Sequence, residues 1–593
     1  MAKGGPAVPF YADVPLVVAW NASGHELKAF AETTPGTKHW SRNIRSPEYY
    51  FRAGLTWPLR SRNFCPQVLP AGTIITVRGS GIYGPDIEAI GALGSSEIFD
   101  SLIRLMSGRI GYPQLNGGDL SLVPVPELSP ESSTRLASLA RRGWSLRRSL
   151  DTCVEVSHAF VVPAVLQVGV GSFGERVTAW AERVTEVEGQ LEDVQSEIDE
   201  LCFDLYEISD EDRVAITQGF GISSESDVSD TDASDTDDDV SGVELDPVGL
   251  AAGLVSWAVG VAVGRFDVRL ATGERDWPVE PDPFEPLPVC SPAMLTGDAG
   301  LPVDEPPSEY PITPSPVLVA DPGHRLDITA RVREVFDVVF GDEADAWWTE
   351  VGETLDPRSG EVSAWLNKGF FDHHLKTHSK SRRKAPILWP IGTTSGSYLV
   401  WLYAHRVTGD SLFRVLNDLI VPKLNTEETK LVRLRQEAGP NPSASERKAI
   451  DTQERFVSEL VELRETVEQV APLWAPDLND GTVIVLAPLS PLFAHHKPWM
   501  RELKKHWNKL AAGDYDWAQL AIHLWPERVI PKCADDRSLA IAHNLEDTFW
   551  QPDPDNPNKW TKRDTPTTPI HQLTTTHHSP TTKTALTKTE TPQ

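Results

Sequence analysis

Residues 184–205, VTEVEGQLEDVQSEIDELCFDL, carry a long periodic pattern of apolar side chains. These side chains recur at alternating spacings of three and four residues, which places them along one face of an α-helix. We expect a long helix here, with its apolar face packed against another helix of the same chain rather than against a partner. The residues of this face are Val184, Val187, Leu191, Val194, Ile198, Leu201 and Leu205.

The sequence before this helix indicates a mixture of strand and helix. Residues 72–79, GTIITVRG, form a β-branched run between two glycines, which predicts a strand. Residues 95–108, SSEIFDSLIRLMSG, have helical spacing, and Ser95 or Ser96 is available as the N-cap. We therefore interpret residues 1–208 as a mixed α/β domain that ends in the long helix.

The rest of the chain is predicted to be mainly helical, so the expected fold class is α+β. Residues 426–436 and 445–470 predict a helix pair, residues 479–493 a strand, and residues 498–529 two tryptophan-rich helices. The apolar run from Val248 to Val263 is shorter than a bilayer span, and we expect it to be a buried helix. The predicted parts are an acidic disordered linker at 209–246, a helix with a proline-rich irregular segment at 247–326, a helical C-terminal domain at 327–550 and a disordered tail at 551–593.

Charge is distributed unevenly along the chain. The formal net charge is -30, yet between Thr33 and Gly79 seven lysines and arginines face one acid, Glu48. Between Glu225 and Asp239 the balance reverses, with eight acids and no base. An acidic chain can therefore still present a local basic surface to nucleic acid.

The basic stretch interleaves arginines with aromatic side chains. Arginine binds phosphate or pairs with guanine, and an aromatic ring can stack on a displaced base. We favour DNA contact for the arginines and a core position for Tyr50, Phe51, Trp57 and Phe64, while keeping Trp57 as a candidate for stacking. The candidates for DNA contact here are Arg42, Arg45, Arg52, Trp57, Arg60, Arg62 and Arg78.

A second basic cluster follows a group of histidines. Four cations within five residues suit contacts with phosphate, although such a run is often simply solvated. They are Lys380, Arg382, Arg383 and Lys384. The preceding Asp372, His373, His374 and His378 could hold a metal, but a polar helix end is the favoured interpretation.

No set of residues predicts a convincing catalytic site. Residues 79–84 and 169–174 match GxGxxG, but neither stands in the strand–turn–helix context of a dinucleotide site, so we interpret both as turns. Asp477, Glu502 and Lys504 fit a loose nuclease spacing, but Glu502 and Lys504 fall on a predicted helix, where they point apart. A magnesium-dependent nuclease therefore remains an alternative, as does a non-catalytic scaffold.

The five cysteines are scattered and suggest neither disulfides nor a zinc site. Together with an N-terminal sequence unlike a signal peptide, this pattern predicts a cytoplasmic protein without a membrane partner.

Six stretches of the sequence carry a resemblance to a known family. They are YYFRAGLTWPLRSRNFCPQVLPAGTI (49–74), FDSLIRLMSGRIGYPQLNGGDLSLVPVP (99–126), SWAVGVAVGRFDVRLATGE (256–274), SKSRRKAPILWPI (379–391), VWLYAHRVTGDSLFRVLNDLIVPKL (400–424) and GDYDWAQLAIHLWPERVIPKCADDRSLAIAH (513–543). They resemble the target-recognition and C-terminal portions of PglX-like adenine-specific DNA methyltransferases of BREX phage-defence systems and of the related DISARM enzymes. The resemblance extends over roughly residues 8 to 550 and implies that residues 1–208 are a target-recognition-like DNA-binding domain.

This resemblance implies a part in S-adenosylmethionine-dependent methylation of adenine N6 in a restriction-modification-like defence system. The family's (N/D/S)PP(Y/F) motif, which grips the flipped base, does not occur in this sequence. We therefore assign no catalytic, cofactor-binding or metal-binding residue and leave open whether the chain is itself an enzyme. The expected partners are double-stranded DNA, a catalytic methyltransferase chain or N-terminal domain, and other defence proteins.

Overall fold

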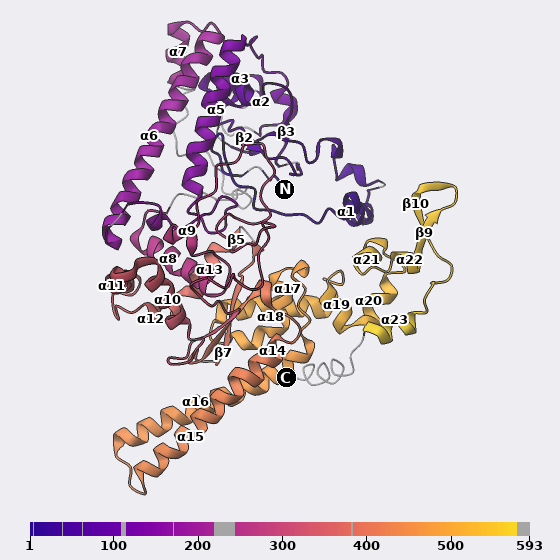
Figure 1. Ribbon diagram of the computed structural model, residues 1–593. Helices are drawn as coiled ribbons and strands as arrows, with labels where there is room; N and C mark the ends of the chain where they lie inside the picture. The colour runs from indigo at the N-terminus through magenta and orange to yellow at the C-terminus, as the bar shows by residue number, and fades with distance from the viewer. Residues whose placement is uncertain are drawn as a thin grey trace. The chain divides into compact units, whose positions relative to one another are not determined.

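The computed structural model describes residues 1–593 apart from 4, 38, 62, 77, 108–113, 170, 219–243, 381, 382 and 578–593 (Figure 1). The fold is α+β, with small sheets and a mainly helical C-terminal region, as predicted. The chain forms two compact units. Unit 1 contains residues 1–18, 45–313 and 333–362, and unit 2 contains residues 19–44, 314–332 and 363–593.

Unit 1 contains a small antiparallel sheet with strand order β2-β1-β3. The central strand β1 (Gly54–Thr56) is buried and pairs with β2 (Gln67–Leu69) and with β3 (Gly81–Ile82). The strand predicted at 72–79 is wrong. The chain reverses there, because Thr76 and Gly79 each donate a backbone hydrogen bond to the other's carbonyl, at 3.0 and 3.2 Å. Such a tight reversal leaves no extended run to join the sheet.

The long helix α6 (Phe173–Leu205) begins eleven residues before the quoted pattern. Ser172 and Glu175 form a capping box at its N-terminus. Its apolar face packs beside helix α5 (Pro130–Asp151) in one hydrophobic core, and the two helices run side by side in Figure 1. The prediction that this face packs within the chain is confirmed. Ser96 also caps α3 as expected, since its Oγ accepts from the backbone N–H of Phe99.

Unit 1 contains further helices before and after α5 and α6 in the chain. The predicted buried helix is confirmed as α8, in which every residue from Leu254 to Ala262 is buried. No helix among the described residues is long and apolar enough to cross a membrane. The helices are α2 (Ile87–Gly94), α3 (Glu97–Ser107), α4 (Gly117–Leu120), α7 (Asp210–Thr217), α8 (Pro247–Ala262), α9 (Arg269–Thr272) and α11 (Ala344–Leu355), with 3-10 turns at Pro47–Tyr49, Ala164–Leu166 and Gly341–Glu343.

Unit 2 is built around buried strands that the sequence pattern did not predict. The sheet has the order β4-β8-β7, with β4 at Val317–Val319, β7 at Leu388–Gly392 and β8 at Leu399–Tyr403. The strand predicted at 479–493 is wrong, because this segment forms helix α17 (Thr482–Leu486) and a 3-10 stretch at Ala487–Phe493. Pro488 and Pro491 lack the N–H groups that a strand interior needs, which outweighs the β-branched run before them.

The predicted helix pair of unit 2 is confirmed as α15 (Val421–Ala438) and α16 (Ala444–Val470), which pack against each other (Figure 1). The remaining helices are α1 (Asn21–Thr33), α12 (Val362–Lys368), α13 (Phe370–Thr377), α14 (Ser411–Arg414), α18 (Lys497–Ala512), α19 (Gln519–Leu524), α20 (Pro526–Lys532), α21 (Arg537–Ala542), α22 (Glu546–Phe549) and α23 (Ile570–His577). Helix α10 (Ile328–Phe340) begins in unit 2 and ends in unit 1.

Regular structure extends into both segments that were expected to be disordered. Helix α7 lies at the start of the predicted linker, with Ser209 as its N-cap, whereas residues 219–243 lie outside the described part of the chain. The predicted tail contains the hairpin of β9 (Trp550–Asp553) and β10 (Asn556–Lys562), followed by α23; its residues 578–593 also lie outside that part. Trp560 attaches the hairpin to the rest of unit 2, because its ring packs against the guanidinium of Arg537 and the ring of His25.

Candidate functional site

The arginine segment, residues 45–79 of unit 1, surrounds the first two strands of the small sheet. Its described arginines are all exposed: Arg45, Arg52, Arg60 and Arg78. Arg52 precedes β1, Arg60 follows it and pairs with Gln114 in an isolated bridge, and Arg78 lies in the reversal before β3. Glu48 is the one acid in this segment. The segment that forms β1 and β2 therefore carries four exposed guanidinium groups and a single acid.

The structure divides the predicted DNA-contacting residues between the two units. Arg42 is also exposed but belongs to unit 2, where its Nη1 donates to the carbonyl of Gly36 at 2.8 Å. Arg62 and Arg382 lie outside the described residues. Arg45, Arg52, Arg60 and Arg78 all belong to unit 1.

Trp57 does not have the position that base stacking requires. It is 2 % exposed, its Nε1 donates to the carbonyl of Leu115 at 2.8 Å, and its ring meets the edge of Phe64. The stacking role considered for Trp57 is therefore wrong, and the core position expected for Trp57 and Phe64 is confirmed. A buried indole with a satisfied N–H contributes to the core rather than to a binding surface.

A different pair of aromatic residues is exposed in the same segment. Tyr49 is 40 % exposed and Phe51 is 47 % exposed, so the core position expected for Phe51 is wrong. The guanidinium of Arg52 lies 5.3 Å from the centre of the Tyr49 ring. Sequence reasoning missed this group, because spacing alone does not tell which of several nearby aromatic residues faces outward.

The second basic cluster forms a hairpin in unit 2. Strand β5 (Ser379–Lys380) pairs with β6 (Arg383–Lys384), so that Lys380 faces Arg383 and Ser379 faces Lys384. Arg383 is exposed, and Lys380 and Lys384 are half-buried. The pairing of the two strands brings Lys380 opposite Arg383 and leaves Lys384 next to it, which suits contacts with phosphate.

The histidines before this hairpin have structural roles. The Nε2 of buried His374 accepts hydrogen bonds from the backbone N–H groups of Ile387 and Leu388, both at 3.0 Å. Asp372 lies 2.8 Å from the Nε2 of His496. Nowhere in the described ranges do three His, Cys, Asp or Glu side chains form a group that could hold a metal ion. His374 therefore fixes α13 to the start of β7.

The nuclease spacing is not supported by the local geometry. Glu502 lies on helix α18, as expected, and its Oε1 lies 3.1 Å from the Nε2 of His506 on the same helix. The Asp477 carboxylate accepts a hydrogen bond from the backbone N–H of Asn479 at 2.9 Å and so closes a local turn. Both carboxylates thus have partners in their own segments, and no observation favours a nuclease.

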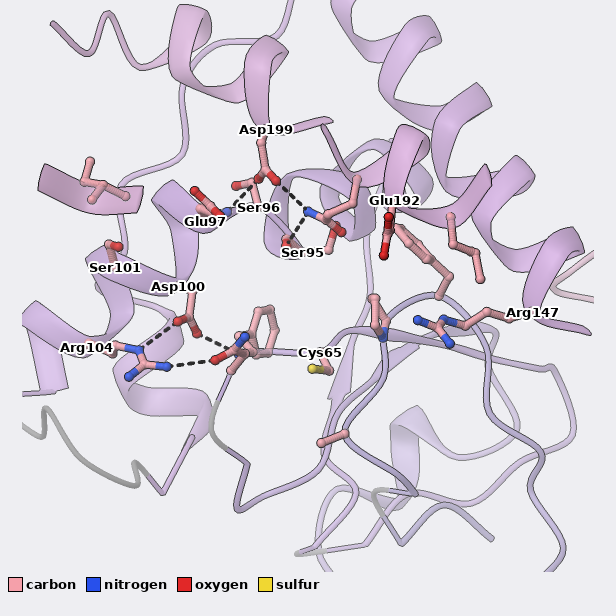
Figure 2. Close-up of a pocket in the computed structure, with 18 of the residues that line it drawn as sticks. Cys65, Ser95, Ser96, Glu97, Asp100, Ser101, Arg104, Arg147, Glu192 and Asp199 are labelled. Carbon is pink, nitrogen blue, oxygen red and sulfur yellow. Dashed lines mark hydrogen bonds and ion pairs between the residues drawn. The ribbon is translucent and has the colours of Figure 1, made fainter. Parts of the chain in front are cut away.

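Unit 1 also contains an open pocket of about 810 Å³ between α3, α6 and the loop at residues 63–65 (Figure 2). Asp199 accepts hydrogen bonds from the Glu97 backbone N–H at 2.8 Å and from Gln195 at 3.2 Å. Asp100 accepts from the backbone N–H of Phe64 and from Arg104. The charged lining residues are five acids and two arginines: Glu97, Asp100, Glu188, Glu192, Asp199, Arg104 and Arg147.

The chemistry of this pocket disfavours phosphate. Acids outnumber arginines in the lining, and Arg104 already binds Asp100 and Asn63. Burial raises the pKa of the Cys65 thiol to about 12, so this cysteine is protonated and a poor nucleophile at neutral pH. The pocket therefore differs in charge from the arginine segment and does not extend it.

No family model matches this chain, and a search of curated proteins finds no match.

Proposed function

We propose that this chain recognises DNA, as the recognition and C-terminal part of an S-adenosylmethionine-dependent adenine-N6 DNA methyltransferase in bacterial phage defence. The observation that carries the proposal is the exposure of Arg45, Arg52, Arg60 and Arg78 around one small sheet in a segment with a single acid. The sequence resemblance described above points to the same function.

Electrostatics explains why this surface is informative in an acidic protein. With a net charge of -30, the chain as a whole repels a polyanion. Contact with DNA then requires a region where positive charge is concentrated, and each phosphate neutralised there releases counterions. The β5–β6 hairpin supplies a second set of cations of the same kind, in Lys380, Arg383 and Lys384.

Methyl transfer is assigned to a catalytic domain or chain that carries the methyl donor and the family's base-gripping motif. This sequence contains neither that motif nor a residue set to which we assign catalysis. In this arrangement the arginine segment positions the DNA, and the partner performs the chemistry.

A salt titration tests the proposal. Binding of the full chain to a fluorescent DNA duplex is measured by anisotropy at several salt concentrations, for the wild type and for the Arg60→Ala/Arg78→Ala double variant. We expect weaker binding and a salt slope reduced by about 2, since each lost phosphate contact removes about 0.9.

The matched control is Arg433→Ala/Arg447→Ala, which removes two exposed arginines from the helix pair α15–α16. This control has the same net charge as the test variant and should leave the slope unchanged. Equal slopes for all three proteins would contradict DNA contact by the arginine segment.

A further inference from the structure

Phe51 has an unusual backbone conformation for an exposed aromatic residue. Its φ angle is 67°, in the left-handed region that side chains with a Cβ rarely adopt. Two backbone hydrogen bonds hold it there: its N–H donates to Thr73 at 2.9 Å, and its carbonyl accepts from Gly72 at 3.0 Å. Strain of this kind persists only where the surroundings fix it, and it is concentrated at functional sites. The conformation keeps a large apolar ring 47 % exposed.

Two sequence neighbours of Phe51, Tyr49 and Arg52, form an ordered group with Tyr83, and we call this group together with Phe51 the aromatic cluster. The Phe51 ring itself lies edge-on to the ring of Tyr50, with centres 6.4 Å apart. The rings of Tyr49 and Tyr83 stack with centres 5.1 Å apart and planes at 27°. Arg52 lies over the Tyr49 ring, in the range of a cation–π contact. The cluster therefore combines the exposed rings of Tyr49 and Phe51 with a guanidinium group held close to Tyr49.

Two glycines make room for Tyr83. A Cβ at Gly54 would lie 2.8 Å from the Tyr83 ring, and a Cβ at Gly81 would lie 2.5 Å from its hydroxyl oxygen. Both distances are shorter than real contacts allow, so the Tyr83 ring lies directly on the backbone of β1 and β3. Gly81 is the middle glycine of the first GxGxxG match, and this packing explains its presence without a dinucleotide.

We infer that the aromatic cluster binds one unstacked nucleobase of DNA, with the ring of Phe51 stacked on the base. This inference rests on the proposed function and deepens it. An aromatic surface flanked by arginines provides both a stacking partner for the base and cations for its neighbouring phosphates. The positive charge of the arginine segment favours DNA, which is a polyanion, over an uncharged apolar ligand.

A duplex with a single unpaired adenine provides the probe, because the unstacking cost is smallest for a base that has no pairing partner. Affinities for this bulged duplex and for the fully paired duplex are measured with the full chain. We expect the wild type to prefer the bulged duplex. Phe51→Ala should lower the affinity for the bulged duplex by about 5- to 100-fold and remove most of the preference.

Two further variants distinguish the contribution of the Phe51 ring from that of its backbone conformation. Phe51→Asn removes the ring but tolerates the left-handed conformation, so it should lose the preference as Phe51→Ala does. Phe51→Tyr keeps the ring and should retain the preference.

The possible results separate this inference from the proposed function. If Phe51→Ala and Phe51→Asn keep the wild-type preference while Arg60→Ala/Arg78→Ala weakens binding to both duplexes, the base site is wrong and DNA recognition stands. A wild type that binds both duplexes equally also overturns the base site. A wild type that binds neither overturns both.

Discussion

At the scale of single residues, Phe51 and Trp57 show what determines the role of an aromatic side chain. Both lie in the same arginine-rich stretch, yet one is 47 % exposed and the other 2 % exposed. The difference comes from the left-handed backbone at Phe51 and from the pairing of β1, which together decide which ring faces the core. Neither is encoded in the spacing of apolar residues. The sequence could therefore identify the segment but not its exposed ring.

The strain at Phe51 predicts a gain in stability on replacement by glycine. Phe51→Gly relieves the left-handed strain of about 1–2 kcal/mol, and the greater freedom of glycine in the unfolded chain offsets part of it. We expect the free energy of unfolding to rise by up to about 1 kcal/mol in urea denaturation. Phe51→Ala keeps the strain and serves as the control. A lower stability for the glycine variant than for the alanine variant would contradict the strain.

Ionisation of Asp199, which lines the pocket of unit 1, should make the free energy of unfolding depend on pH. Burial raises the pKa of Asp199 from 3.8 to about 6, so ionising it disfavours the folded state as the pH rises through this range. Asp199→Asn removes this cost. The raised pKa corresponds to a loss of stability of at most roughly 3 kcal/mol when Asp199 ionises. Because the side chain is partly solvated, we expect a loss of about 1–2 kcal/mol.

The measurement is the free energy of unfolding of wild type and Asp199→Asn at pH 4 and at pH 7. The free energy of unfolding of Asp199→Asn, relative to that of the wild type, should be higher at pH 7 than at pH 4. Asp193→Asn, an exposed site on the same helix, should show no such change. An equal difference at both pH values for Asp199→Asn would refute the effect of burial.

At the scale of elements, helix periodicity was the most informative part of the sequence. It predicted α6 and the pair α15–α16, because a helix buries its own repeating stripe over many residues. Helix α8 was instead predicted from its continuous apolar run. Short strands carry far less pattern. Strand β7 is buried along its whole length and contains Pro390, so neither alternation nor the absence of proline marks it.

The packed face of α6 predicts the cost of a cavity. Ile198 is fully buried in the core of unit 1. Ile198→Ala should lower the free energy of unfolding by about 2–4 kcal/mol, because it removes buried methyl groups and leaves a void. Chemical denaturation measures this loss, with the exposed Asp193→Ala on the same helix as the control. A change in oligomeric state by light scattering, with stability kept, would instead indicate a helix that pairs with a partner.

At the scale of the whole molecule, positive charge on each unit predicts how the two contribute to DNA binding. Lys380→Ala/Lys384→Ala removes two cations of unit 2, and Arg60→Ala/Arg78→Ala removes two of unit 1. If both surfaces contact phosphate, each pair should reduce the salt slope by about 2, and the quadruple variant should reduce it by about 4. Anisotropy titrations measure these slopes. A quadruple variant no weaker than the Arg60→Ala/Arg78→Ala variant would restrict DNA contact to unit 1.

The arrangement of the units could not be predicted from the order of the sequence. A contiguous C-terminal domain was expected from residue 327, but residues 333–362 belong to unit 1 and residues 19–44 belong to unit 2. Sequence patterns report local periodicity and composition, whereas membership of a unit depends on contacts between distant segments.

This interleaving has a consequence for how the protein is made. Unit 1 includes residues from Met1 to Val362, so a ribosome must pass residue 362 before the unit is complete. Residues 19–44 can complete their contacts in unit 2 only later, because the rest of that unit lies at residues 314–332 and 363–593 and is synthesised afterwards. During that interval the nascent chain exposes apolar surface, which makes it a substrate for chaperones. A premature stop codon anywhere before residue 362 would therefore leave both units incomplete.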